Sequence, residues 1–348
     1  MKLFKCQACG NILYFENRTC GQCGHRLGYV PELSAISALE QVDNNRWKPL
    51  GSSEHRFFCA NAKYDACNWL VPVGTSDAFC TACRHNSIIP DLSVGANLVA
   101  WQKIELAKHR LFYTLLRWKL PLRTIAENPA HGLSFEFLED APTKVMTGHE
   151  EGKITIALKE ADDAERESRR VSMGEPYRTL LGHFRHEIGH YFWDVLVRDG
   201  GKLDACRAVF GDDRQNYSEA LRRHYEEGAP VDWEQHFVSK YATAHPWEDF
   251  AETWAHYLHI VDTLEMAGAW GIAVKPKLDE AGNHSAILTF DAYFAECIQQ
   301  IVDSWIPFVF AINSLTRAMG ERDLYPFIIA PAVVNKLGFI HRLVHGDL

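Results

Sequence analysis

Cys6-Gln-Ala-Cys9 and Cys20-Gly-Gln-Cys23 open the chain and decide the fold of its first part. Each pair has the CxxC spacing, and ten residues separate the two pairs. Two short turns of this kind can face each other and present four thiolates in a tetrahedron, which is the geometry that zinc prefers. The spacing therefore predicts a structural zinc site built from these four cysteines. A redox-active CxxC pair is the alternative interpretation.

A second set of cysteines follows within the first 83 residues, which hold eight of the ten cysteines in the chain. Cys80 and Cys83 form another CxxC pair, whereas seven residues separate Cys59 from Cys67. In a reducing compartment such clustering indicates metal binding rather than disulfides. We expect a second structural zinc on these four cysteines. The alternatives are a cross-brace between the two sets, or a Cys59 or Cys67 that is simply a small buried residue.

Composition bounds the class of protein. The chain has 348 residues, 47% of them hydrophobic, and a net charge of −9. The charge argues against an extensive nucleic-acid footprint, although residues 1–90 carry 9 basic and 7 acidic side chains, or +2. No apolar run approaches the ~18 residues of a membrane helix. The N-terminus reaches Cys6 without the apolar core of a signal peptide. We expect a cytoplasmic protein without membrane contact.

The pattern along the chain predicts two regions and an α+β fold. Residues 1–90 would form the cysteine-rich module, with loops and short strands at 24–56, and residues 91–348 a mainly helical domain with a small sheet. Periodicity predicts a long helix from Ala96 to Trp118, with Glu105 and Lys108 on its exposed side. Two strands are expected at Leu133–Leu138 and Lys153–Leu158, and the second could be an edge strand that pairs with an extended peptide. Between them 148–152 suggests a turn, and 160–170 a solvated connection.

The remaining sequence is helical in pattern from Glu175 onward. Pro176 suits a first helical turn, and Gly200-Gly201 would end that helix. Further helices are expected at 215–227, 232–241, 247–266, 290–302, 308–318 and 332–343.

His186-Glu187-Ile188-Gly189-His190 is an HExxH motif on the first of these helices. Histidines at i and i+4 point the same way, so both imidazoles can reach one zinc. Glu187 lies beside that face and can take a proton from a zinc-bound water. The alternative is two ordinary histidines on a helix flank.

A catalytic zinc usually has three protein ligands and a water, so a third ligand must come from elsewhere. Residues 245–256 offer one, because Glu248 and Glu252 lie at i and i+4 on a helix rich in aromatic residues. Two carboxylates on such a helix are unfavourable to bury without partners. One could ligate zinc and the other could hydrogen-bond a ligating histidine. An exposed acidic flank is the alternative.

The segment from HEIGH to Glu252 resembles the gluzincin zinc peptidases of the lethal-factor type. Those peptidases carry HExxH, then a tyrosine seven residues before a ligand glutamate, then a second glutamate four residues further on. Tyr241, Glu248 and Glu252 have this spacing. The resemblance implies His186, His190 and Glu248 as zinc ligands, Glu187 as the general base and Tyr241 as an oxyanion donor. Glu252 is then the carboxylate that we expect to hydrogen-bond a ligating histidine.

A resemblance over nearly the whole chain is to the bacterial family of zinc-binding metallopeptidases that join an N-terminal zinc ribbon to an HExxH domain. It rests on the cysteine array, on Tyr177 to His190, and on 324–327 with 336–341. It implies a zincin-like domain after the ribbon but adds little about the substrate. From the candidate sites themselves we expect one catalytic and two structural zinc ions, and a peptide or protein substrate.

Two other functions remain open. The ribbon could dock on a protein partner or guide a protease to nucleic acid. Alternatively, the chain could be a non-enzymatic adaptor whose HExxH zinc is structural, in which case His183 or Glu252 would close the site as a fourth ligand.

Overall fold

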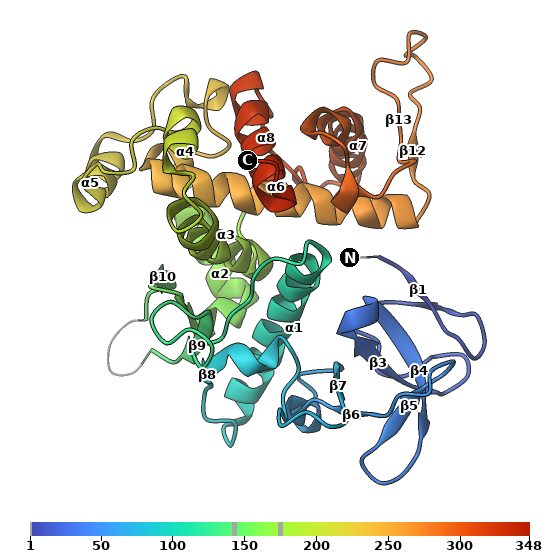
Figure 1. Cartoon of the computed structure of the whole chain (residues 1–348). Helices are drawn as coiled ribbons and strands as arrows, with labels where there is room; N and C mark the ends of the chain where they lie inside the picture. Colours follow the sequence, from blue (N-terminus) through green and yellow to red (C-terminus); the bar gives the residue numbers. More distant parts are fainter. Residues whose placement is uncertain (1, 141–144, 173–176) are drawn as a thin grey trace. The chain divides into compact units, whose positions relative to one another are not determined.

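The computed structural model describes residues 2–140, 145–172 and 177–348 (Figure 1). The chain divides into two compact units, Met1–Arg169 and Arg170–Leu348. The cysteine-rich region and the long helix that follows it belong to the first unit. The expected domain boundary near residue 90 stays a prediction. The α+β class is confirmed: a cysteine-rich region with small sheets precedes a largely helical part.

The first unit begins with a short hairpin and an antiparallel five-stranded sheet in chain order, so residues 24–56 are more regular than expected. A bridge between Tyr29 and Trp69 brings the outer strands of the sheet together. A Cβ on Gly28 would lie 2.7 Å from Leu70 Cγ, so this approach requires glycine at position 28. The strands are β1 (Phe4–Lys5), β2 (Ile12–Leu13), β3 (Arg26–Val30), β4 (Ala35–Gln41), β5 (Trp47–Pro49), β6 (Arg56–Phe58) and β7 (Leu70–Pro72).

Helix α1 (Gly95–Arg117) matches the predicted helix to within a residue at each end. The expectation that Glu105 and Lys108 face solvent is wrong, because both are fully buried. The Lys108 Nζ lies 2.8 Å from Glu105 Oε1, and Asn86 Nδ2 donates to the same oxygen at 2.7 Å. The two charges are therefore buried as a hydrogen-bonded pair, which a pattern of apolar residues does not reveal.

A second sheet of the first unit has the order β10-β11-β9-β8. Its strands are β8 (Asn86–Ile88), β9 (Ser134–Leu138), β10 (Gly148–Glu150) and β11 (Lys153–Ala157). The two predicted strands are confirmed, but β11 lies between β9 and β10. The expectation of a peptide-binding edge at Lys153–Leu158 is therefore wrong. Of the expected turn at 148–152, residues 148–150 form an edge strand, and the turn itself is at 151–152.

The segment expected as a solvated connection, 160–170, is largely exposed as expected, but it is mostly helical and begins with buried residues. Most of it belongs to α2 (Asp163–Ser172). Glu160 is 1% exposed and accepts a hydrogen bond from Arg169 Nη1 at 2.7 Å. This bond links the later part of α2 to the turn that precedes the helix.

The second unit is built around the long helix α6, drawn in orange in Figure 1, with α3 on one side of it and α7 and α8 on the other. Its helices and short strands are α3 (Leu180–Phe192), α4 (Leu203–Phe210), α5 (Tyr217–Glu227), α6 (Pro246–Ala269), β12 (Ala273–Val274), β13 (Ala286–Ile287), α7 (Ile298–Ala318) and α8 (Pro331–His345). None of the helices in the described ranges is long and apolar enough to cross a membrane.

Several helix predictions for this unit need correction. The predicted helix at 232–241 is wrong, since only short 3-10 turns occur at Trp233–Gln235 and Tyr241–Thr243. The helices predicted at 290–302 and 308–318 are one helix, α7, which contains Pro307. After α3 the chain continues as a π-helical turn, Trp193–Arg198, before Gly200. The predicted helix start at Glu175 and Pro176 lies outside the described residues.

The crossing of α3 and α6 positions the HExxH motif. The Thr179 side chain caps α3 by accepting from Gly182 N at 3.0 Å, and Pro246 occupies the first turn of α6. A Cβ on Gly189 would lie 3.0 Å from Ala251 Cα and 3.3 Å from Trp254 Cβ. The absence of a side chain at Gly189 thus lets the two helices approach closely, and it brings the first turns of α6 against the motif.

Candidate metal centres

The α3–α6 crossing brings three donor atoms together. The Nε2 atoms of His186 and His190 lie 3.2 Å apart. Glu248 Oε2 lies 3.1 Å from His186 Nε2 and 3.4 Å from His190 Nε2. Two donors bound at about 2.05 Å to a tetrahedral zinc are about 3.3 Å apart. The separations therefore fit a zinc ion, and His186, His190 and Glu248 are the three residues of this donor group.

The protonation pattern also favours a cation at this point. Glu252 Oε1 lies 2.7 Å from His186 Nδ1, and a carboxylate can only accept, so Nδ1 carries the proton. In the neutral imidazole the lone pair is then on Nε2, which faces His190 and Glu248. Glu248 is 1% exposed, and its Oε2 is buried without a hydrogen-bond donor. A buried carboxylate oxygen directed at two histidine nitrogens is costly unless a cation lies between them.

Glu252 lies behind His186 rather than in the donor group. Its Oε2 accepts a hydrogen bond from Ser239 Oγ at 2.6 Å, and Ser239 Oγ accepts from Ala242 N at 3.1 Å. Burial raises the pKa of Glu252, but the hydrogen bond to His186 and the charges of His186 and His256 outweigh burial and lower the pKa to about 2. Glu252 is therefore ionised, and it fixes the ring orientation of His186.

His190 is oriented differently, through its ring face. The ring centroid of His190 lies 3.7 Å from that of Trp247, at an interplanar angle of 34°. Trp247 belongs to the first turn of α6, so the same helix start supplies both Glu248 and the support for His190.

Tyr217 is a site residue that the sequence analysis missed. It begins α5 directly after Asn216, whose side chain caps the helix. The Tyr217 hydroxyl donates to Glu248 Oε1 at 2.6 Å, which fixes the carboxylate so that Oε2 faces the histidines. Burial and the negative charges of Glu248 and Glu187 raise the pKa of the Tyr217 phenol. No sequence signal links Tyr217 to Glu248, because the two residues are 31 positions apart in the chain.

Tyr241 and Glu187 line the same site. The Tyr241 ring centroid lies 5.9 Å from that of His186, and burial together with the charge of Glu248 raises the pKa of the Tyr241 phenol. The phenol is therefore a neutral hydrogen-bond donor at ordinary pH. Glu187 is 8% exposed and directly follows His186 on α3.

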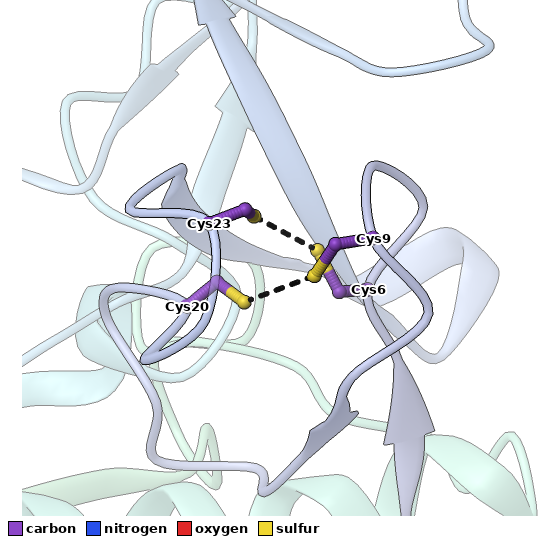
Figure 2. A group of neighbouring side chains, drawn as sticks. All are labelled: Cys6, Cys9, Cys20 and Cys23. Atoms are coloured by element: carbon purple, nitrogen blue, oxygen red, sulfur yellow. Dashed lines mark hydrogen bonds between the residues drawn. The ribbon is translucent and has the colours of Figure 1, made fainter.

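The first cysteine set forms a compact group, as Figure 2 shows for Cys6, Cys9, Cys20 and Cys23. The Cys6 and Cys23 sulfurs are 3.7 Å apart, and those of Cys9 and Cys20 are 3.6 Å apart. Zn–S bonds of about 2.3 Å in a tetrahedron give S···S separations of about 3.75 Å. The four thiols therefore fit a zinc ion.

Each pair of the first set is held by the same kind of turn. The amides of Gly10 and Gly24 donate to the carbonyls of Cys6 and Cys20, both at 2.9 Å. Both glycines have a positive φ, of 79° and 75°, which other residues rarely adopt.

The second cysteine set is fully buried, and the two sets are grouped in sequence order rather than cross-braced. The sulfurs of Cys67 and Cys80 lie 3.7 Å apart, and the donor atoms of Cys59, Cys67, Cys80 and Cys83 all lie within 4.8 Å of one another. His109, on α1, was missed by the sequence analysis, although its Nε2 lies 3.2 Å from Cys67 Sγ.

Two family models match the chain. Residues 97–343 match the family described as "Putative zinc-binding metallo-peptidase", and residues 3–94 match a zinc-ribbon domain. No solved structure matches the chain.

Two curated relatives, an uncharacterized protein of Mycobacterium tuberculosis strain H37Rv and one of Mycobacterium bovis, are each 41% identical over 347 residues. The aligned region covers 99% of this chain and 95% of each relative. The zinc-ribbon match precedes the HExxH region, and the two motif histidines share one donor group with Glu248 of α6. The chain belongs to the family of zinc-binding metallopeptidases.

Proposed function

We propose that the protein is a zinc-dependent peptidase of the gluzincin type, which hydrolyses peptide bonds with a zinc-activated water. The convergence of His186 Nε2, His190 Nε2 and the donor-free Oε2 of Glu248 carries this proposal. Two further zinc ions on the cysteine sets would be structural, which gives three per chain.

Glu187 is the proposed general base. When bound at His186, His190 and Glu248, zinc would polarise the scissile carbonyl and lower the pKa of a water molecule. The Glu187 carboxylate would accept a proton from that water and return it to the leaving amine. Its position next to His186 on α3 keeps it at the site without making it one of the three donors.

The two tyrosines suit the charge that develops during hydrolysis. An oxyanion forms as water attacks the carbonyl, and neutral hydrogen-bond donors stabilise it. The Tyr241 phenol, kept protonated by burial and by the charge of Glu248, is the proposed donor. Tyr217, bonded to Glu248, is the proposed positioning residue for the third ligand.

An adaptor with a purely structural zinc is less well supported. Such a site needs a fourth protein ligand, for which Glu252 is one candidate. Both Glu252 oxygens have hydrogen bonds, one with His186 Nδ1 and one with Ser239. In the described part of the chain the donor group has three residues, which leaves a position for water.

The test is the hydrolysis of a diverse peptide mixture, followed by mass spectrometry, with the zinc content of each sample measured. We expect the zinc-loaded protein and an exposed-residue control, Glu227→Gln, to cleave. Glu187→Gln should keep its zinc and lose cleavage, since Glu187 handles protons and does not hold the metal. Cleavage by Glu187→Gln at the parental rate would refute the proposed mechanism.

A further inference from the structure

The second cysteine set has a fifth potential metal donor, His109, which projects from α1. Its Nε2 lies 3.2 Å from Cys67 Sγ, 3.6 Å from Cys83 Sγ and 3.9 Å from Cys80 Sγ. The ring is buried, as are the three cysteines. A single nitrogen thus faces three sulfurs at once, inside the first unit.

The other ring nitrogen determines what Nε2 can do. His109 Nδ1 lies 2.6 Å from the main-chain oxygen of Glu105, and a carbonyl oxygen can only accept, so Nδ1 carries a proton. In the neutral imidazole Nε2 then has the lone pair, and it points at the sulfurs. A histidine that ligates a metal through one nitrogen commonly donates its other N–H to a backbone carbonyl in this way.

The distances fit a mixed tetrahedron. With Zn–S bonds of about 2.3 Å and a Zn–N bond of about 2.05 Å, tetrahedral geometry places nitrogen and sulfur about 3.55 Å apart. The three observed separations, 3.2, 3.6 and 3.9 Å, lie around this value. The Cys67–Cys80 separation of 3.7 Å fits as well. Since zinc takes four ligands, one of the five donors is left over.

Charge favours the imidazole over a fourth thiolate. Four thiolates on Zn²⁺ carry a net charge of −2, whereas three thiolates and a neutral imidazole carry −1. The neighbouring Glu105 and Lys108, both fully buried, are paired with each other at 2.8 Å, so that together they add no net charge beside the site. Glu105 Oε2 is also only 3.5 Å from Cys83 Sγ, so further negative charge here is unfavourable.

We propose that the second zinc is held by Cys67, Cys80, Cys83 and His109, and that Cys59 is the spare donor. The three cysteines lie in the part of the chain that matches the zinc ribbon, and His109 lies in the part that matches the peptidase. The zinc therefore joins the ribbon to α1, so that the two form one folded unit instead of a module on a linker.

The experiment compares Cys59→Ser, His109→Gln and Cys67→Ser in the full-length protein. Zinc content is measured after dialysis against a moderate chelator, and circular dichroism checks folding. We expect Cys59→Ser to keep the parental zinc content. Because the spare Cys59 thiol lies close enough to replace a lost donor, His109→Gln and Cys67→Ser are made in the Cys59→Ser background, where each should lose one equivalent. Loss of an equivalent from Cys59→Ser alone, or full retention by the Cys59→Ser/His109→Gln double variant, would overturn the proposal.

Cobalt substitution gives a second readout, and in the parent protein it does not depend on the stability of any variant. The sulfur-to-cobalt charge-transfer absorption of the parent should correspond to seven Co–S bonds, four at the first site and three at the second. We expect the spectrum of Cys59→Ser to match that of the parent. An absorption in the parent that corresponds to eight Co–S bonds and falls in Cys59→Ser would also overturn the assignment.

Discussion

Gly189→Ala tests the claim that a close helix crossing builds the HExxH site. The new Cβ would lie 3.0 Å from Ala251 Cα and 3.3 Å from both Ala251 O and Trp254 Cβ. Two of these are backbone atoms of a buried segment, so α3 and α6 must move apart by a few tenths of an ångström. Overpacking of this kind costs ~1–3 kcal/mol, whereas replacing glycine by alanine in a helix gains ~1 kcal/mol. We expect a net loss of about 1 kcal/mol.

Gly268→Ala is the matched control, because it lies on α6 and its Cβ would meet Leu288 Cβ at an ordinary 3.6 Å. It should stabilise the protein by up to about 1 kcal/mol through the helix preference of alanine. Urea-induced unfolding of the zinc-loaded proteins gives both values, and a zinc titration shows whether Gly189→Ala also binds the HExxH zinc more weakly. If Gly189→Ala is as stable as Gly268→Ala and binds zinc like the parent, the crossing does not depend on this contact.

Three further predictions concern the site and its surroundings. Tyr241→Phe should keep its zinc and turn over ~100–1,000-fold more slowly, because an oxyanion donor is lost. Tyr217→Phe should mainly weaken zinc binding, because Glu248 Oε1 loses its hydrogen-bond donor. Steady-state kinetics and zinc titrations compare the two variants, and the same behaviour in both would contradict this prediction. Glu252→Ala should retain zinc with an affinity ~10–100-fold lower, since it orients His186 without ligating, and complete loss of zinc would instead make Glu252 a ligand. His341 is buried beside the Tyr257 hydroxyl, and burial lowers the pKa of His341 from 6.5 to about 4. The unfolded chain therefore takes up the proton first, and stability is lost as the pH falls from 6.5 to 4. In His341→Gln the free energy of unfolding should depend on pH less steeply in this window, by up to one proton, and an unchanged slope would count against the prediction.

The sequence suffices to predict those parts of the site whose residues are close together in the chain. The four-residue spacing of His186 and His190 places both on one face of any helix. The CxxC pairs predict their own turns, because two cysteines three residues apart can face one ion. The helix expected at Ala96–Trp118 agrees with α1 because its apolar residues repeat with the helical period over more than five turns.

What could not be predicted depends on contacts between distant segments. Tyr217 reaches Glu248 only because α5 lies beside the start of α6, and no local pattern encodes that contact. Ser239 was inside a segment that was expected to be helical and instead forms the turn that supports Glu252. Buried charge is equally hidden, since Glu105 and Lys108 are indistinguishable in sequence from residues on a solvated helix face.

The same limit applies to His109. It is one of 17 histidines in the sequence, and it is 26 residues from the nearest cysteine of the set that it contacts. Only the packing of α1 against the cysteine-rich region within the first unit reveals it as a potential donor. Metal ligands that come from different elements are therefore the ones that spacing rules overlook.

The most direct test of the central claim is an anomalous-difference map, recorded at the zinc absorption edge, of crystals of the zinc-loaded protein. We predict a peak within bonding distance of His186 Nε2, His190 Nε2 and Glu248 Oε2, with solvent in the fourth position and Glu252 hydrogen-bonded to His186. A peak whose fourth ligand is a protein side chain would contradict the peptidase proposal. The lack of any peak between these three residues would contradict the metal site itself.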